Sequence, residues 1–166
     1  MAKKGSVLIC DDEEIMRDVL ETILSGAGYK VDLARSGEEA LEAYAQKPYD
    51  VVLMDVSMPG MGGLTALQEL IKLDANAYIL MITAYATFDT AISAWEKGAT
   101  GVIRKPFKNE QIIALVNKGV KKRRNEEERQ TLRQAMTRSV QRGSIIGRSE
   151  KMETIFRLIE RVAPAR

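Results

Sequence analysis

Five polar side chains stand within two residues of the ends of short apolar segments of this chain, in positions that could form one reactive site. Asp11 and Asp12 follow Ser6–Cys10, and Asp55 follows Val51–Met54. Thr83 follows Tyr78–Ile82, and Lys105 follows Gly101–Ile103 after one intervening residue. Crowded carboxylates raise one another's pKa, and a divalent cation such as Mg²⁺, which prefers oxygen ligands, relieves this. An ionised carboxylate can then act as a nucleophile toward a phosphoryl group. A lysine would neutralise the phosphoryl oxygens, and a threonine hydroxyl would donate a hydrogen bond to one of them.

The segments that must position these residues alternate between two patterns over the first 120 or so residues. Five short apolar runs predict strands, at Ser6–Cys10, Lys30–Leu33, Val51–Met54, Tyr78–Ile82 and Gly101–Ile103. Stretches of helical periodicity lie between them and after the last. This alternation predicts a parallel sheet covered by helices on both faces, with right-handed crossovers. Ligands of such sheets bind beyond the carboxyl ends of the strands, so the five polar residues should meet in one crevice.

The helical stretches each carry an apolar stripe that should face the sheet. The stripes are Ile15, Met16, Val19, Leu20, Ile23 and Leu24; Ala40, Leu41, Tyr44 and Ala45; Leu64, Leu67, Leu70 and Ile71; Ala91, Ile92 and Trp95; and Ile112, Leu115 and Val116. Gly26, Gly28 and Gly98 stand where helices should end. We expect Cys10 to be a buried, inert strand residue and Trp95 to be in the core or half-buried.

Composition excludes several classes of function. The 166 residues contain no histidine, which rules out histidine-based catalysis. The single cysteine forbids an internal disulfide and suits a reducing cytoplasm. A formal net charge of +2 gives no overall electrostatic footprint for nucleic acid, so we expect no direct nucleic-acid binding. No apolar run is long enough to span a bilayer, and the N-terminus lacks the apolar region of a signal peptide.

The motifs together resemble the receiver domains of bacterial two-component response regulators. They are Asp-Asp-Glu at 11–13, Asp-Val-Ser-Met-Pro-Gly-Met at 55–61, Thr-Ala-Tyr-Ala-Thr at 83–87 and Lys-Pro-Phe at 105–107. The resemblance covers residues 6–120 and implies an α/β fold of the (βα)5 flavodoxin/CheY-like kind: a doubly wound, parallel five-stranded sheet in the order 2-1-3-4-5. It also implies that the phosphoryl donor is a phosphohistidine on a sensor histidine kinase.

The same resemblance assigns a role to each site residue. Asp55 is the phosphoacceptor, and Lys105 and Thr83 contact the phosphoryl group. Asp12 and Asp55 bind Mg²⁺ directly, together with the backbone carbonyl of Ser57, and Asp11 holds a metal-bound water. Ala84 beside Thr83 leaves room for the phosphoryl group.

Two positions depart from the pattern of the family. The aromatic residue that usually couples to the threonine is replaced by Val102, and Gly62 stands where an aspartate is usual. We therefore expect either that Thr83 acts alone or that Tyr85 or Phe107 reports the change. With Thr83, Ala84 and Val102, these two residues make up the candidate switch.

The C-terminal part differs in character from the receiver-like part. Residues 121–129 are charged on every face, and Leu132, Met136 and Val140 then repeat every four residues. We interpret 121–143 as a helical linker continuing the last receiver helix, with these three residues as a short homodimer seam that also involves that helix. The alternative is a solvated single helix, because so thin a stripe is marginal by itself.

Residues 144–166 resemble the opening of the AAA+ ATPase core of sigma-54-dependent activators of the nitrogen-regulator type. The resemblance rests on Ser-Ile-Ile-Gly-Arg-Ser at 144–149 and on an amphipathic segment with Met152, Ile155, Phe156 and Ile159. It predicts a chain truncated at the start of this domain. The sequence contains no Gly-x-x-x-x-Gly-Lys-Ser/Thr, so we expect no ATPase activity from it.

Other interpretations remain open at this point. Asp11 and Asp12 could simply cap a helix that begins at Glu13. The sheet could belong to a phosphatase of the haloacid-dehalogenase-like type, but such enzymes carry the nucleophilic aspartate after the first strand. The domain could also be a stand-alone receiver that acts by docking to proteins, without an ATPase output.

Overall fold

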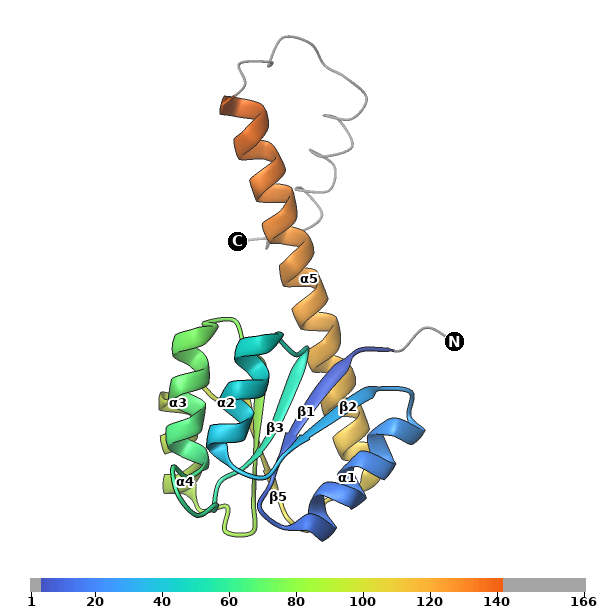
Figure 1. Cartoon of the computed structure of the whole chain (residues 1–166), viewed down its shortest axis with the longest axis vertical. Helices are drawn as coiled ribbons and strands as arrows, with labels where there is room; N and C mark the ends of the chain where they lie inside the picture. Colours follow the sequence, from blue (N-terminus) through green and yellow to red (C-terminus); the bar gives the residue numbers. More distant parts are fainter. Residues whose placement is uncertain (1–3, 142–166) are drawn as a thin grey trace. The chain divides into compact units, whose positions relative to one another are not determined.

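Five parallel strands form one sheet in the order β2-β1-β3-β4-β5 (Figure 1). The structure, a computed structural model, describes residues 4–141. The strands are β1 (Ser6–Cys10), β2 (Lys30–Ala34), β3 (Val51–Asp55), β4 (Ile79–Thr83) and β5 (Gly101–Arg104). The predicted doubly wound α/β fold and strand order are therefore confirmed.

The five helices alternate with the strands along the chain. They are α1 (Glu14–Gly26), α2 (Gly37–Gln46), α3 (Gly63–Leu73), α4 (Phe88–Glu96) and α5 (Asn109–Gln141). Helices α1 and α5 cover one face of the sheet, and α2, α3 and α4 cover the other (Figure 1). None of the helices in the 4–141 range is long and apolar enough to cross a bilayer.

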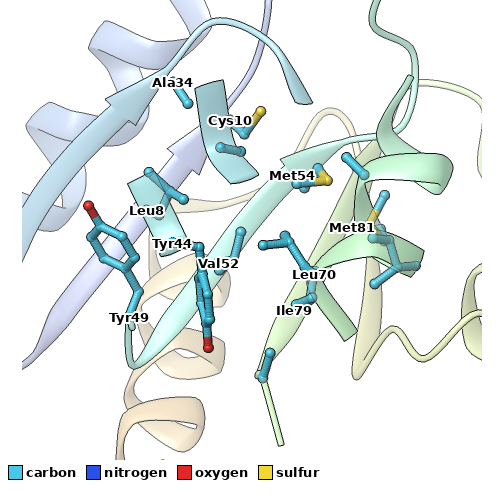
Figure 2. Packing of buried hydrophobic residues seen from close by; sticks show 14 of the residues in the cluster. Leu8, Cys10, Ala34, Tyr44, Tyr49, Val52, Met54, Leu70, Ile79 and Met81 are labelled. Atoms are coloured by element: carbon cyan, nitrogen blue, oxygen red, sulfur yellow. The ribbon is translucent and has the colours of Figure 1, made fainter. Parts of the chain in front are cut away.

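The central strands supply side chains to both layers, because successive residues of a strand point to opposite faces. Strands β3 and β4 are buried along their whole length, which explains their uninterrupted apolar sequences. Figure 2 shows the core on the α2/α3 side, where Val52 and Met54 pack with Tyr44 and Leu70. Leu53 and Ile82 point to the other core, beneath α1 and α5. Cys10 is buried, as predicted.

The predicted helix faces were partly wrong. Ile15 and Trp95 are 78% and 57% exposed, and Val19 is 44% exposed. In α1, Leu20 and Leu24 of the predicted stripe are buried, together with Arg17, which was not in it, and in α4 the buried side chain is Ala94. A small alanine lets α4 lie against the sheet, which turns the larger Trp95 outward.

Helix α5 is held close to the amino ends of the strands. A Cβ at Gly119 would lie 2.6 Å from ring carbons of Tyr78, so only glycine allows this approach. Four residues further on, Arg123 forms a 2.7 Å ion pair with Asp74, which also accepts a 2.7 Å hydrogen bond from the Tyr44 hydroxyl. These contacts fix the register of α5 on the sheet.

The expected extended C-terminal helix is confirmed, since α5 runs unbroken to Gln141. The chain divides into two compact units at Arg124, and the described part of the second unit, 125–141, is helical. Within it, Val140 is 61% exposed. The predicted AAA+ segment, 144–166, lies outside the described residues.

Candidate functional site

The predicted reactive residues meet at the carboxyl ends of the strands. Asp11 directly follows β1, and Lys105 directly follows β5. Asp55 and Thr83 were expected just beyond β3 and β4, but each is the last residue of its strand. Asp55 pairs with Ile82, and the ladder continues past it, because the Val56 N–H donates to the Ile82 carbonyl at 2.9 Å. The rigid sheet therefore positions the candidate nucleophile directly.

Three carboxylates cluster at this edge. One oxygen each from Asp11, Asp12 and Asp55 lies within 4.8 Å of the others. Asp11 and Asp55 are only 1% and 5% exposed, whereas Asp12 is exposed. Ser57 lies two residues beyond β3, in the exposed loop at the same edge. Hard oxygen donors on one open side suit a cation that keeps several waters, so this donor set fits Mg²⁺.

Lys105 joins two of these carboxylates. Its Nζ lies 3.1 Å from Asp55 Oδ1 and 3.2 Å from Asp11 Oδ2. Burial raises the pKa of Asp55 to about 6; the charges of Asp11 and Asp12 add to this, and Lys105 opposes it. Burial alone would lower the pKa of Lys105, but its contacts with Asp55 and Asp11 prevail and raise it. The lysine is thus a fixed cation beside the buried carboxylate.

The turn after β1 is held by contacts to both carboxylate oxygens of Asp11 and to its backbone carbonyl. Its Oδ1 accepts from the Glu13 N–H at 2.9 Å, and its Oδ2 faces Lys105. Its backbone carbonyl accepts from Arg17 Nη1 at 2.7 Å. Asp11 thus holds the Glu13 N–H at the entrance to the helix, in part as the capping alternative expects, but α1 begins at Glu14 with Glu13 as the N-cap residue, and capping does not account for the contact with Lys105.

The loop between β3 and α3 depends on two glycines. Gly62, where an aspartate is usual, has a φ of +75° and a ψ of 158°, a conformation that side chains rarely allow. A Cβ at Gly63 would lie 2.0 Å from the backbone oxygen of Asp55. The Gly63 N–H donates to the Val56 carbonyl at 3.1 Å, and Glu38 accepts from the Met61 N–H at 3.2 Å. The loop is therefore packed directly against the carboxylate-bearing residue.

The candidate switch residues are not gathered in one place. Thr83 is 2% exposed, and its Oγ1 accepts a 3.1 Å hydrogen bond from the Tyr85 N–H, which leaves the hydroxyl proton available for donation. The Ala84 and Tyr85 side chains are exposed. Val102 packs on the α2/α3 side of the sheet and Phe107 on the α1/α5 side. The switch assignment therefore stays a prediction.

Two residues at the site did not emerge from the sequence. Arg17 did leave a signal: it precedes Leu20 and Leu24 by three and seven residues, so it lies on the buried side of α1. A charged residue on such a stripe indicates a buried polar contact. Gly63 left no comparable signal, because its close approach to Asp55 exists only in three dimensions.

Comparison with known proteins agrees with this geometry. Residues 7–117 match the family model described as the response regulator receiver domain. The DNA-binding transcriptional regulator NtrC of Klebsiella pneumoniae is 35% identical over 161 residues, which are 97% of this chain and 34% of that protein. The chemotaxis protein CheY of Thermotoga maritima is 40% identical over 113 residues, which are 68% of this chain and 94% of that protein.

Solved structures share the fold. A chain from the CheX–CheY–BeF3–Mg²⁺ complex of Borrelia burgdorferi is 32% identical, with a TM-score of 0.65 over 67% of this chain and 85% of that one. NtrX of Brucella abortus in complex with ADP is 30% identical, with a TM-score of 0.73 over 99% of this chain and 36% of that one. The chain thus spans about a third of the length of the NtrC relatives it matches.

Proposed function

Because this chain belongs to the response regulator receiver domain family, we propose that Asp55 accepts a phosphoryl group from a phosphohistidine of a sensor histidine kinase, in an Mg²⁺-dependent reaction. A bond forms between an Asp55 carboxylate oxygen and phosphorus as the bond from phosphorus to the histidine nitrogen breaks. The product is an aspartyl phosphate, and the chain acts as a signalling domain. Such a reaction needs mainly positioning and charge stabilisation.

Each site residue has a role in this proposal. Asp12, Asp55 and the Ser57 carbonyl would bind the metal, and Asp11 would hold a metal-bound water. Bound Mg²⁺ would keep Asp55 ionised and neutralise phosphoryl oxygens. Lys105 exchanges its contact with Asp55 for one with the phosphoryl group, and Thr83 donates its hydroxyl proton.

The observation that carries the proposal is the convergence of two other carboxylates, Asp11 and Asp12, and one lysine on Asp55. Their oxygens lie within 4.8 Å of one another, and Lys105 Nζ lies 3.1 Å from Asp55 Oδ1. These groups come from three different strands, so no local structural need accounts for their meeting. The similarity to a chain from a complex that contains BeF3 and Mg²⁺ supports the metal assignment.

Incubation with Mg²⁺ and acetyl phosphate tests the proposal. We expect intact-protein mass spectrometry to detect the gain of one phosphoryl group, which Asp55→Asn or removal of Mg²⁺ with EDTA abolishes. Asp50→Asn is the matched control: Asp50 precedes the same strand at its other end, where it accepts a hydrogen bond from the Ser6 N–H at 2.8 Å. The proposal fails if Asp55→Asn still gains the group, or if Asp50→Asn loses it.

The output would be a sigma-54-dependent AAA+ activator of which this chain forms the regulatory part. In this proposal residues 1–120 are the receiver, 121–143 the linker and 144–166 the start of the AAA+ domain, all in the cytoplasm. The alignment with Klebsiella NtrC supports it, because it includes 97% of this chain rather than the receiver alone. Phosphorylation would act by biasing the receiver and linker between two states.

The linker is proposed to form a homodimer through Leu132, Met136 and Val140. We expect Leu132→Asp with Met136→Asp to convert a dimer into a monomer, because charges cannot be buried in an apolar seam. Light scattering measures the mass, and Gln134→Asp on the same helix should leave the dimer intact. A form ending at Arg124, which retains the Asp74–Arg123 pair, should also be monomeric. If the full chain and this shorter form each had the mass expected of its own monomer, the seam would be ruled out.

A further inference from the structure

Arg17 is a buried charge that the proposed reaction does not use. It is 8% exposed and lies on α1 with the core residues Leu20 and Leu24. Removing a guanidinium from water is costly unless polar partners replace the water. The partner here is the backbone carbonyl of Asp11, at 2.7 Å from Nη1 in a buried hydrogen bond. The helix thus places a permanent cation underneath the turn that carries two of the three carboxylates.

Arg17 and Lys105 contact different parts of the same site. Lys105 approaches the carboxylates from β5 and contacts their side-chain oxygens. Arg17 approaches from α1 and contacts the main chain, so its hydrogen bond leaves the carboxylate oxygens available.

We propose that Arg17 is a positioning residue for the Mg²⁺ site. By holding the Asp11 carbonyl, it fixes the peptide that joins Asp11 to Asp12 and so aims the exposed Asp12 carboxylate at the metal. The Glu13 N–H and Lys105 hold the two side-chain oxygens of Asp11, and its backbone N–H donates to the Ala34 carbonyl at 3.2 Å, so Arg17 supplies the contact that holds the Asp11 carbonyl itself. The inference rests on the proposed metal site and adds a residue to it.

A purely structural role makes a different prediction. If Arg17 only filled space beneath the turn, its replacement would lower stability without changing metal affinity in the molecules that remain folded. Partners that orient metal ligands typically change affinity by roughly 10- to 100-fold when they are removed. Metal affinity, measured on folded protein, therefore separates the two roles.

The test compares Arg17→Gln and Arg17→Lys with the intact chain by calorimetric titration with Mg²⁺. Arg123→Gln is the matched control, since Arg123 is likewise an arginine of low exposure but is paired with Asp74, at the other end of the sheet. We expect Arg17→Gln to raise the Kd for Mg²⁺ by about 10-fold or more. The Kd of Arg17→Lys should fall between those of the intact chain and Arg17→Gln, because lysine keeps the charge but not the guanidinium geometry. Arg123→Gln should lower stability and leave the Kd unchanged.

Phosphorylation by acetyl phosphate gives a second readout. For Arg17→Gln, the Mg²⁺ concentration at half-maximal rate should rise with the Kd, whereas the rate at saturating Mg²⁺ should approach that of the intact chain. An unchanged Kd in Arg17→Gln overturns the inference; if that variant does not fold, an unchanged Kd in Arg17→Lys does so. Failure of the intact chain to bind Mg²⁺ would instead overturn the proposed function.

Discussion

Asp55→Asn is expected to raise the free energy of unfolding of the metal-free protein by about 3 kcal/mol above roughly pH 7. Burial raises the pKa of Asp55 from 3.8 to about 6, so the folded state disfavours the ionised form. Below pH 3.8 the carboxyl is neutral in both states and costs nothing. As the pH rises toward 6 the unfolded chain ionises first, so stability falls across this window. The asparagine has no such charge and avoids the loss.

Denaturant titration in EDTA at several pH values measures this effect. The difference between the two proteins should be small near the lower end of the window and should grow through it, then level off. Mg²⁺ should narrow the difference, because a cation that binds the ionised site stabilises the folded wild type. A difference in the free energy of unfolding that does not depend on pH would mean that folding does not raise the pKa of Asp55.

Gly63→Ala is expected to destabilise the protein by about 3 kcal/mol or more, at or above the upper end of the usual cost of overpacking a core. The added Cβ would lie 2.0 Å from the Asp55 backbone oxygen and 2.9 Å from its carbonyl carbon. Neither atom can move without distorting β3, because the strand is bonded on both sides. Folded molecules of this variant should therefore carry a displaced Asp55 and accept phosphoryl groups slowly.

Gly26→Ala is the control for this substitution. Gly26 is the last residue of α1, and no atom lies within 4 Å of the Cβ that alanine would add. Alanine there should leave stability unchanged or raise it by about 0.5 kcal/mol. Thermal unfolding and the phosphorylation rate are measured for both variants, and we expect Gly63→Ala alone to lower both stability and rate. Similar stability in the two would show that the loop after Asp55 yields more easily than its packing indicates.

The strands and the meeting of the site residues could be predicted from the sequence, because both follow from one rule of parallel sheets. Strands buried on two faces carry uninterrupted apolar runs, so their limits are visible to within a residue. Asp55 and Thr83 were placed one residue too far only because a polar side chain ends the apolar run before the backbone ladder ends. The carboxyl ends of parallel strands then bring distant residues together regardless of the details of packing.

What the sequence left undetermined depends on how closely elements approach one another. Ile15 and Trp95 share the spacing of buried residues but are exposed, since spacing alone does not fix which side of a wide stripe faces the sheet. The contact of Gly63 with the Asp55 backbone likewise depends on how closely α3 approaches the end of β3, which the sequence does not specify. Arg17 is intermediate: its position on the buried side of α1 could be predicted, whereas its partner, the Asp11 carbonyl, could not.

The most direct test of the central claim is to locate the phosphoryl group. After reaction with acetyl phosphate and Mg²⁺, borohydride reduction converts an aspartyl phosphate into homoserine, which peptide mass spectrometry assigns to a single residue. Our account predicts homoserine at position 55, with Asp11 and Asp12 unmodified. Homoserine at position 11 or 12 with Asp55 intact, or no homoserine in a protein that has gained a phosphoryl group, would contradict it.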